Sequence, residues 1–393
     1  MKYRTFGSLD YRPSALGFGA MRLPLLAAGA DGKVVASRID EPLATRMLHY
    51  AIDHGVNYVD TAYVYHEGAS EGWLGRALKG GYREKVKVAT KLPQWKATTV
   101  ADFDRLLDEQ LERLDLPSID FYLLHSLDSG NWPKARDLGV LRWAETALSD
   151  GRIGHLGFSF HDEFALFEEI IAASDLWSFC QIQWNYMDEE NQAGTRGLEF
   201  AAEKGLAVIV MEPLRGGQLA RTPPAKIEAL WDAAAADGVG APGVTPVEWA
   251  LRWVWNRPEV SLLLSGMSTM EQVEQNVRYA DRAGAGVLGE DEIAVIARVR
   301  EAYRGLVPIA CTSCNYCLPC PNGVKIPDIF AIYNDAEVYG HRDLAQMYYG
   351  WLEDGERADQ CTQCGECEAV CPQKIAVIEW LERAQAYFCV GDG

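Results

Sequence analysis

The distribution of cysteine is the feature of this 393-residue sequence that most constrains how the chain can fold. Nine of its ten cysteines lie between Cys311 and Cys389, in the last fifth of the chain. Eight of the nine form two compact quartets, each followed directly by a proline. The first quartet is Cys311, Cys314, Cys317 and Cys320, and the second is Cys361, Cys364, Cys367 and Cys371. Quartets this dense predict a region that is organised around bound metal.

The spacing of the quartets favours iron–sulfur clusters over zinc or disulfides. The second quartet follows the C-x2-C-x2-C-x3-C-P run that is typical of bacterial ferredoxins with [4Fe–4S] clusters. A reducing compartment disfavours disulfides, and bridges between such close neighbours would be strained. Zinc sites with four cysteines usually separate the two pairs by a longer loop. We therefore predict two [4Fe–4S] clusters, with zinc as the alternative.

In two-cluster ferredoxins the fourth cysteine of each run ligates the other cluster. We therefore expect one cluster on Cys311, Cys314, Cys317 and Cys371, and the other on Cys361, Cys364, Cys367 and Cys320. The first quartet has two residues rather than three before its last cysteine, which leaves this cross-ligation open. Between the quartets, residues 327–340 and 341–354 carry apolar residues at helical spacing. The pattern predicts a small, mainly helical ferredoxin-like domain over residues 304–393.

The charge of the chain excludes some partners and suggests another. The chain has 37 Lys and Arg residues and 56 Asp and Glu residues, which gives a formal net charge of −19. This negative charge argues against binding to nucleic acid or to anionic membranes. No apolar run reaches the ~18–20 residues of a membrane span, and the N-terminal sequence does not resemble a signal peptide. We therefore expect a cytoplasmic protein. The final 93 residues hold 14 acidic and 6 basic side chains, which predicts a redox partner protein with a basic face.

The first three hundred residues alternate short apolar runs with amphipathic stretches. Alternation of this kind predicts parallel strands joined by helical crossovers. Eight strands over about 270 residues match a (β/α)₈ TIM barrel, which we predict over residues 1–303. A doubly wound sheet is the alternative, but no G-x-G-x-x-G follows any strand. The expected strands are residues 15–20, 56–60, 86–90, 120–125, 154–159, 179–183, 207–211 and 260–265.

Polar side chains stand where three successive strands end, which is the face of a TIM barrel that carries chemistry. Asp60 ends the second strand, Lys91 follows the third and His125 ends the fourth, while Tyr65 lies in the loop after Asp60. A buried Lys91 needs a partner, and Asp60 is the candidate. The lysine charge should lower the pKa of Tyr65, so that this tyrosine donates a proton to a carbonyl oxygen oriented by His125. Each residue alone could be a cap, a solvated cation or a core histidine, but their joint placement favours a site.

Several runs resemble a known family. The segments GVNYVDTAYVYHEGASEGWLGRAL, VATK, DFYLLH and GRIGHLGFS resemble the aldo/keto reductase superfamily over about residues 2–303. The segments CNYCLPCPNGVKIPDIF and CTQCGECEAVCPQKI resemble its subgroup with a C-terminal ferredoxin-like extension. The resemblance implies a catalytic tetrad of Tyr65, Asp60, Lys91 and His125, with Tyr65 as the proton donor. It also implies NAD(P)H bound in an extended form across the barrel mouth.

The same resemblance implies the cofactor-binding residues. These are Gly19, Ala20 and Met21 for the nicotinamide ribose, Ser159 and Gln181 for the nicotinamide amide, Met211, Pro213, Leu214, Arg215, Gly216 and Gly217 around the nicotinamide and pyrophosphate, and Ser268, Gln272 and Asn276 for the adenosine phosphate. Met211 stands where many members have an aromatic residue, and Phe160 replaces a common asparagine. Gly266 and Gln272 stand where many members have basic residues. The resemblance favours NADP, with NAD as the alternative.

The two regions together predict an oxidoreductase in which a barrel that reduces small carbonyl substrates is coupled to a two-cluster electron conduit. Nicotinamide moves two electrons as hydride and a cluster moves one, and the sequence contains no flavin motif to connect them. Two alternatives stay open: a plain NADPH-dependent carbonyl reductase with structural clusters, and a nucleotide-binding redox sensor with little turnover. Trp132 is the one candidate for a wall of the substrate site, and Cys180 is expected to be a small buried hydrophobe.

Overall fold

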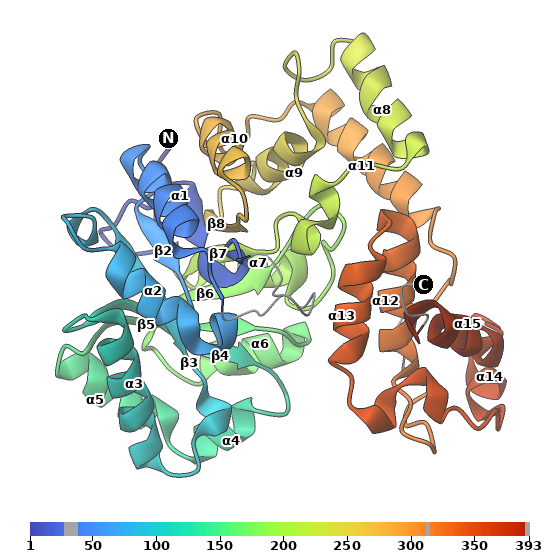
Figure 1. The fold of residues 1–393 in the computed structure, drawn as a ribbon, viewed down its shortest axis with the longest axis horizontal. Helices are drawn as coiled ribbons and strands as arrows, with labels where there is room; N and C mark the ends of the chain where they lie inside the picture. The colour runs from blue at the N-terminus through green and yellow to red at the C-terminus, as the bar shows by residue number, and fades with distance from the viewer. Residues whose placement is uncertain (27–37, 312–314, 390–393) are drawn as a thin grey trace. The chain divides into compact units, whose positions relative to one another are not determined.

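The computed structural model describes residues 1–26, 38–311 and 315–389 and divides into two compact units (Figure 1). The first unit comprises Met1–Gly216 and Val244–Glu290, and the second comprises Gly217–Gly243 and Asp291–Gly393. Cys314, which the sequence predicts as a cluster ligand, lies outside the described residues. The domain boundary expected after residue 303 stays a prediction.

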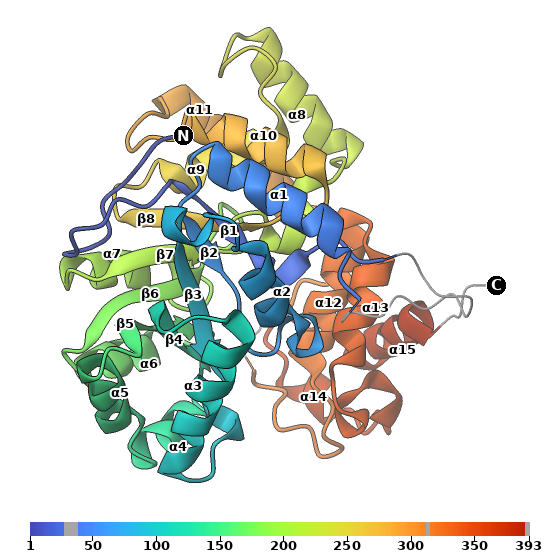
Figure 2. The same cartoon turned by 60° about the vertical axis from the view of Figure 1, so that its left-hand side comes forward.

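Eight parallel strands close into a barrel in the first unit, in the order in which they occur along the chain (Figures 1 and 2). The predicted TIM barrel is therefore confirmed, and the doubly wound sheet is excluded. The strands are β1 (Leu16–Gly19), β2 (Tyr58–Asp60), β3 (Lys87–Leu92), β4 (Ile119–Leu127), β5 (Ile153–Phe160), β6 (Trp177–Gln183), β7 (Ala207–Met211) and β8 (Val260–Gly266).

Helices surround the barrel, and all of them except α10, which follows β8, lie in sequence between its strands (Figure 2). They are α1 (Glu41–Asp53), α2 (Ala69–Ala77), α3 (Val100–Leu114), α4 (Trp132–Asp137), α5 (Val140–Ser149), α6 (Phe164–Ala172), α7 (Gly194–Glu203), α9 (Pro246–Trp255) and α10 (Met270–Ala280). Helix α3 shows how the sequence defines such an element. Thr99 and Asp102 form a capping box at its start, Phe103 and Leu107 are buried, and Asp115 ends it with a φ of 53°.

A separate apolar cluster fills the inside of the barrel. Because side chains alternate along a strand, every second residue of each strand faces this interior. Phe121 lies at the centre of a group of aromatic rings, with centroids 4.9 Å from Phe6, 5.4 Å from Phe179 and 5.5 Å from Tyr58. The cluster comprises Phe6, Tyr58, Ala89, Phe121, Leu123, Phe179, Ala207, Ile209, Leu262 and Leu264. It forms the floor beneath the carboxyl ends of the strands.

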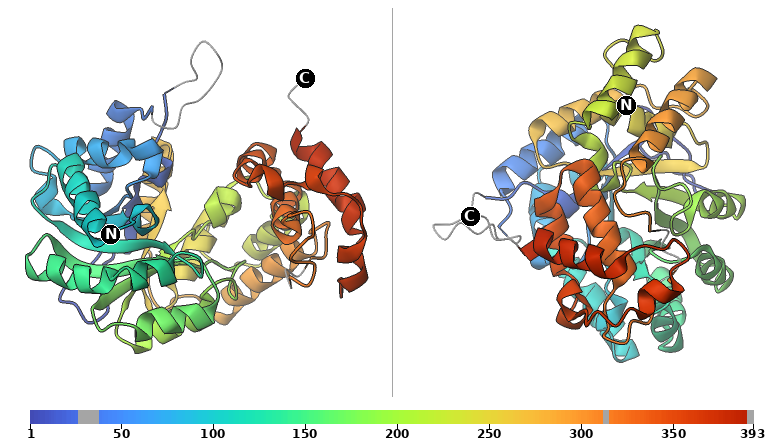
Figure 3. Two further views of the ribbon diagram at one scale, coloured as in Figure 1. Left: turned by 90° about the horizontal axis from the view of Figure 1, so that it is seen from below. Right: turned by 90° about the vertical axis from the view of Figure 1, so that its right-hand side faces the viewer.

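The second unit is helical, and its helices from α11 onward are coloured orange to red in Figure 3. Its helices are α8 (Ala225–Ala236), α11 (Glu290–Arg304), α12 (Ile326–Tyr339), α13 (Arg342–Gly350), α14 (Glu366–Val370) and α15 (Val377–Cys389). Helices α12 and α13 confirm the two helices expected between the cysteine quartets. The buried Asn334 accepts from the backbone N–H of Ile309 at 2.9 Å and donates to its carbonyl at 2.8 Å. Within the described ranges, no helix combines the length and hydrophobicity that crossing a bilayer requires.

Candidate active site

One inward-facing residue near the carboxyl end of each strand belongs to a ring at that end of the barrel. Each member lies two positions beyond a residue that faces the barrel interior, so alternation points it to the same side. The ring consists of Gly19, Asp60, Lys91, His125, Ser159, Gln181, Met211 and Gly266. The barrel therefore brings together residues that the sequence assigned to catalysis and to the cofactor, directly above an apolar floor.

Lys91 is the most connected member of this ring. Its Nζ donates to Asp60 Oδ1 at 2.6 Å, to the Thr61 carbonyl at 2.8 Å and to Tyr65 Oη at 3.2 Å, which uses all three donors of an ammonium group. The Lys91 and Asp60 residues are 1% and 2% exposed. Burial acts to lower the pKa of Lys91, but the Asp60 carboxylate and Tyr65 outweigh it, so the pKa is raised and the lysine is charged. The predicted pairing of Lys91 with Asp60 is confirmed.

The pKa of Tyr65 moves in the opposite direction from the prediction. Burial of the phenol raises it, and the charge of Lys91 opposes this shift without cancelling it. The sequence predicted a lowered pKa because it shows the charged neighbour but not the burial of the phenol. Tyr65 is therefore protonated at neutral pH. Since Lys91 donates to its oxygen, the phenolic hydrogen is left to point elsewhere.

The loop after β2 contains a second tyrosine, and its contacts separate it from Tyr65. Tyr63 donates from Oη to Glu109 Oε2 at 2.8 Å, and its ring lies 4.0 Å from the guanidinium carbon of Arg113. Both partners belong to α3, so Tyr63 is tied to the outer helices. Tyr65 is the tyrosine of this loop that contacts the buried lysine.

His125 is 8% exposed and its backbone is held from both sides by Gln94. The Gln94 amide donates to the His125 carbonyl at 2.6 Å and accepts from the His125 N–H at 3.0 Å. Burial first, and then the charge of Lys91, hold the pKa of His125 well below its usual value. The imidazole is therefore neutral at physiological pH and can hydrogen-bond a ligand without carrying charge.

The positions expected to bind a nicotinamide amide offer polar atoms at the ring. Ser159 Oγ accepts from the Ser126 N–H at 2.7 Å, which leaves its hydroxyl hydrogen to donate elsewhere. Gln181 Nε2 lies 3.7 Å from Met211 Sδ, while Gln181 Oε1 is buried and has no hydrogen-bond partner within the described part of the chain. A carboxamide needs one donor and one acceptor, so these residues fit that group.

The residues expected to hold the pyrophosphate lie in the loop after β7, which also contains Pro213 and Leu214. Arg215, Gly216 and Gly217 have φ values of 50°, 66° and 101°, a left-handed run in which glycine is favoured. Arg215 Nε donates to Asp188 Oδ2 at 3.0 Å, so an internal carboxylate already engages this guanidinium.

The residues expected to bind the adenosine phosphate bond to one another and to the β1 loop. Ser268 Oγ donates to the Arg22 carbonyl at 2.8 Å, and the Ser268 N–H donates to Gln272 Oε1 at 2.8 Å. Asn276 Nδ2 donates to Ser265 Oγ at 3.1 Å. Ala20 and Met21 lie in the short 3-10 helix Ala20–Arg22 that leaves β1.

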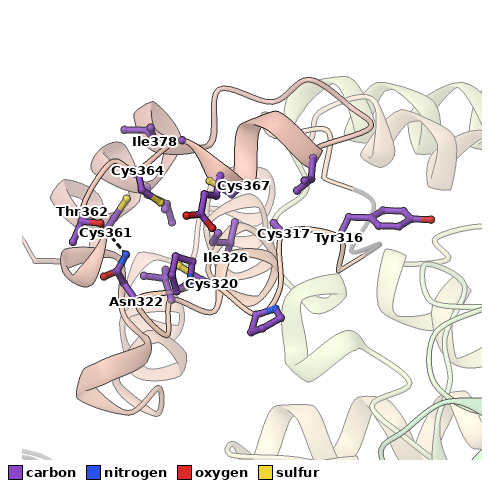
Figure 4. Close-up of a pocket in the computed structure, with 17 residues that line it drawn as sticks. Tyr316, Cys317, Cys320, Asn322, Ile326, Cys361, Thr362, Cys364, Cys367 and Ile378 are labelled. Atoms are coloured by element: carbon purple, nitrogen blue, oxygen red, sulfur yellow. Dashed lines mark hydrogen bonds between the residues drawn. The ribbon is translucent and has the colours of Figure 1, made fainter.

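Cysteine side chains line two neighbouring cavities in the helical unit. The larger has a volume of about 580 Å³, part of it open to solvent, and Figure 4 shows cysteine sulfur atoms from both quartets around it. The smaller has a volume of about 370 Å³. Cys317, Cys320, Cys361, Cys364 and Cys367 line the larger cavity, and Cys311, Cys317 and Cys371 line the smaller one.

Comparison with known proteins identifies the first region. The model of the aldo/keto reductase family matches residues 15–318. The chain belongs to the aldo/keto reductase family. A second model, that of a 4Fe-4S dicluster domain, matches residues 310–376, so this aldo/keto reductase carries an iron–sulfur domain at its C-terminal end. The predicted family and its ferredoxin-like extension are both confirmed, and the protein is an oxidoreductase.

Two curated relatives match most of their own length. Aflatoxin B1 aldehyde reductase member 2 of Homo sapiens is 26% identical over 327 residues, 71% of this chain and 87% of the relative. The 6-dehydroglucose reductase of Novosphingobium aromaticivorans is 28% identical over 299 residues, 72% of this chain and 90% of the relative.

Solved structures share the fold of this aldo/keto reductase. An aldo-keto reductase from Bacillus halodurans in its holo form has a TM-score of 0.60 at 24% identity, covering 76% of this chain and 96% of its own. One from Klebsiella pneumoniae in complex with NADPH has a TM-score of 0.59 at 24% identity, with the same coverage.

The predicted substrate wall is wrong. Trp132 is fully buried and donates from Nε1 to Glu169 Oε1 at 3.1 Å, so it is part of the packing of the outer helices. Trp95 instead lies beside the site of this reductase, with its ring centroid 5.3 Å from that of His125 and 46% of its surface exposed. Trp95 follows β3 within four residues of Lys91, a position at a strand end that could have suggested it. Cys180 is buried in β6, as expected.

A buried polar network behind β3 supports Lys91, and sequence reasoning missed it. Glu71 of α2 has no exposed surface and accepts from Thr90 Oγ1 and from Gln110 Nε2, each at 2.6 Å. Arg113 lies 3.3 Å from its other oxygen. Gln110 Nε2 also lies 3.0 Å from the Lys91 carbonyl. The network therefore fixes the main chain of Lys91 from the side opposite to Asp60.

We expect His125→Asn to remove part of the pH dependence of stability. The unfolded chain gains a proton on His125 below a pKa of about 6.5, whereas the buried imidazole resists protonation. The wild-type free energy of unfolding should therefore fall as pH drops below about 6.5, by up to ~1.4 kcal/mol per pH unit from this group. Urea unfolding between pH 5 and pH 8 should give a shallower slope for the variant. His54→Asn, at the exposed end of α1, is the matched control. Equal slopes for the wild type and His125→Asn would contradict the assignment.

Proposed function

We propose that the barrel is an NADPH-dependent reductase of small carbonyl compounds and that Tyr65 is its proton donor. The observation that carries this proposal is the hydrogen bond from the buried, charged Lys91 to Tyr65 Oη. A charged donor on this oxygen stabilises the phenolate as the proton leaves, while burial keeps the phenol protonated until then. The NADPH complex of the Klebsiella pneumoniae structure and the aldehyde reductase name of the human relative are consistent with this activity.

Four residues of the chain each have a separate role in the proposed reduction. When bound, the nicotinamide supplies a hydride, which carries both electrons to the carbonyl carbon. Tyr65 donates its phenolic proton to the carbonyl oxygen, so that the C=O double bond becomes an alcohol. Lys91 stabilises the phenolate left on Tyr65, and Asp60 keeps Lys91 charged in its buried position. The neutral His125 donates a hydrogen bond that orients the same oxygen.

The nicotinamide is positioned by groups at the opposite side of the ring. Gln181 Oε1 would accept from the carboxamide N–H and Ser159 Oγ would donate to the carboxamide oxygen, which would satisfy the buried acceptor that has no partner among the described residues. Met211 would line the same part of the site. The exposed Trp95 forms an aromatic side of the substrate site next to His125. The loop with Arg215 binds the pyrophosphate, and we favour NADP over NAD.

We further propose that the two cysteine cavities hold two [4Fe–4S] clusters. Cys320 lines the larger cavity together with Cys361, Cys364 and Cys367, which supports the expected exchange of a fourth ligand between the quartets, and Cys317 lies between the two cavities and lines both. Cys311, Cys317 and Cys371 line the other. The spacing of the first quartet assigns Cys314, which lies outside the described residues, as the fourth ligand of that cluster. Clusters in these cavities supply one-electron transfer.

The neighbouring cavities support an electron conduit. Tyr316, Cys317 and Ile326 line both of them, so clusters held there would lie close together. Tyr316 is 68% exposed and its ring points away from the sulfur atoms of the larger cavity (Figure 4). We propose that a partner protein with a basic face exchanges electrons here, because acidic residues predominate in this part of the sequence.

Replacing Tyr65 by phenylalanine should abolish proton donation and leave the cofactor site intact. We expect the kcat for reduction of an aromatic aldehyde to fall by about 10²–10⁴-fold. The Kd of NADPH, measured by fluorescence titration, should stay within about twofold because Tyr65 acts on the substrate. Tyr63→Phe removes a hydroxyl from the same loop that bonds to Glu109, and its kcat should stay near that of the wild type. Unchanged turnover in Tyr65→Phe would exclude Tyr65 as the donor.

Metal analysis of protein purified without oxygen tests the clusters. The wild type should contain about eight iron and about eight sulfide per chain, as two [4Fe–4S] clusters require. Cys364→Ala should lose about half of both, because it removes a thiolate from one cavity. Cys180→Ala, in the buried strand β6, should retain the full content. Zinc without sulfide in the wild type would refute the proposal.

A further inference from the structure

A second arginine lies at the barrel mouth, outside the set of cofactor residues that the family resemblance implies. Arg22 ends the short 3-10 helix after β1 and is half-buried. Its backbone carbonyl accepts from Ser268 Oγ at 2.8 Å, which connects the loops that follow β1 and β8. The N–H of Leu23 donates to His66 Nε2 at 3.2 Å. The main chain on either side of Arg22 is therefore held in place.

The side chain of Arg22 lies across the eighth position of the ring of strand ends. A Cβ atom added to Gly266 would meet Cβ, Cγ and Cδ of Arg22 at 3.1, 3.2 and 3.3 Å. Gly19 and Gly266 are paired neighbours in the sheet, so the arginine extends from one strand end over the next. The absence of a side chain at Gly266 is what leaves room for Arg22. Position 266 lacks a basic side chain of its own, and a cationic side chain from the loop after β1 covers it.

The charge of Arg22 has no counter-ion within the part of the chain that the structure describes. Among those residues, no carboxylate pairs with its guanidinium, and no side chain or carbonyl accepts a hydrogen bond from it. Arg215, the other arginine at the mouth, is bonded to Asp188 at 3.0 Å. The charge of Arg22 also acts to lower the pKa of Tyr65, after the larger effects of burial, Lys91 and Asp60. A half-buried cation in such surroundings is placed to bind an anion.

We propose that Arg22 is an oxyanion-binding residue of the barrel mouth and that its guanidinium holds a phosphate or carboxylate group of a bound ligand. The inference rests on the proposed function, because nucleotide and substrate both bind at this face. The oxyanion comes either from the dinucleotide or from an anionic carbonyl substrate. Planar guanidinium donors match the paired oxygens of both groups.

Binding measurements on Arg22→Gln and Arg22→Lys test this inference. We expect Arg22→Gln to weaken binding of one ligand class by about tenfold or more. The loss should be smaller in Arg22→Lys, which keeps the positive charge but lacks the planar guanidinium that binds two oxygens at once. The probes are NADPH, NADH, and the matched substrates 4-carboxybenzaldehyde and 4-nitrobenzaldehyde. The control is Arg142→Gln, which removes an exposed charge from α5.

The pattern of losses identifies the source of the oxyanion. Weaker binding of both nucleotides assigns Arg22 to the pyrophosphate, and weaker binding of NADPH alone assigns it to the 2′-phosphate. A raised KM for 4-carboxybenzaldehyde but not for 4-nitrobenzaldehyde assigns it to a substrate carboxylate. If Arg22→Gln changes all of these by less than about twofold, the inference is wrong.

Failure of the proposed function gives a different result. In that case the wild type binds neither nucleotide, and inorganic pyrophosphate becomes the probe for Arg22, with tryptophan fluorescence as the signal. Binding by the wild type and not by Arg22→Gln would support the oxyanion site without the reductase. Equal binding, or none by either protein, would overturn the inference.

Discussion

The buried ion pair between Lys91 and Asp60 is the interaction on which the site depends. Both residues have almost no exposed surface, and leaving one charge without the other costs about 3–5 kcal/mol in comparable pairs. The pair is tolerated because Lys91 also donates to the Thr61 carbonyl and to Tyr65. The same set of bonds that keeps a cation inside the protein therefore places it against the phenol that is proposed to react. Stability and chemistry require the same geometry here.

The barrel produces this geometry through strand alternation. Asp60 is paired with Ala89 in the sheet, and Lys91 lies two residues farther along on the same inward side. A shift of one residue in either strand would turn one of the two charges toward the outer helices. The aromatic floor around Phe121 fixes the inward register below the ring. The apolar interior thus determines which side chains reach the mouth.

Much of the fold and of the ring could be predicted from the sequence, because strand ends are visible as apolar runs followed by polar residues. The iron–sulfur region is likewise visible in the sequence, because cluster ligation requires cysteines at short and regular spacing. Contacts made by side chains that reach back from helices could not be predicted, and Gln94, Glu71 and Gln110 are examples. The contacts with His125, Thr90 and the Lys91 carbonyl span 19 or more residues, and they depend on how the helices pack.

Two predictions failed because the sequence shows which residues are near one another along the chain but not how far each side chain is buried. The sign of the Tyr65 pKa shift depends on burial outweighing the charge of Lys91. Trp132 follows a strand end, as a substrate wall would, but it is covered by its surroundings and has no exposed surface. The number of clusters and their ligands remain predictions that metal analysis addresses.

The two proposed activities of the chain differ in how many electrons move at a time, since a hydride carries two electrons and a cluster carries one. The central claim is that the carbonyl receives both electrons as hydride in the barrel. An anaerobic single turnover with NADPH deuterated at the transferred C4 position tests this directly, with mass spectrometry of the alcohol as the measurement. The account predicts one deuterium on the carbinol carbon for each NADPH consumed. Alcohol that forms without deuterium, or from dithionite-reduced protein lacking NADPH, would contradict it.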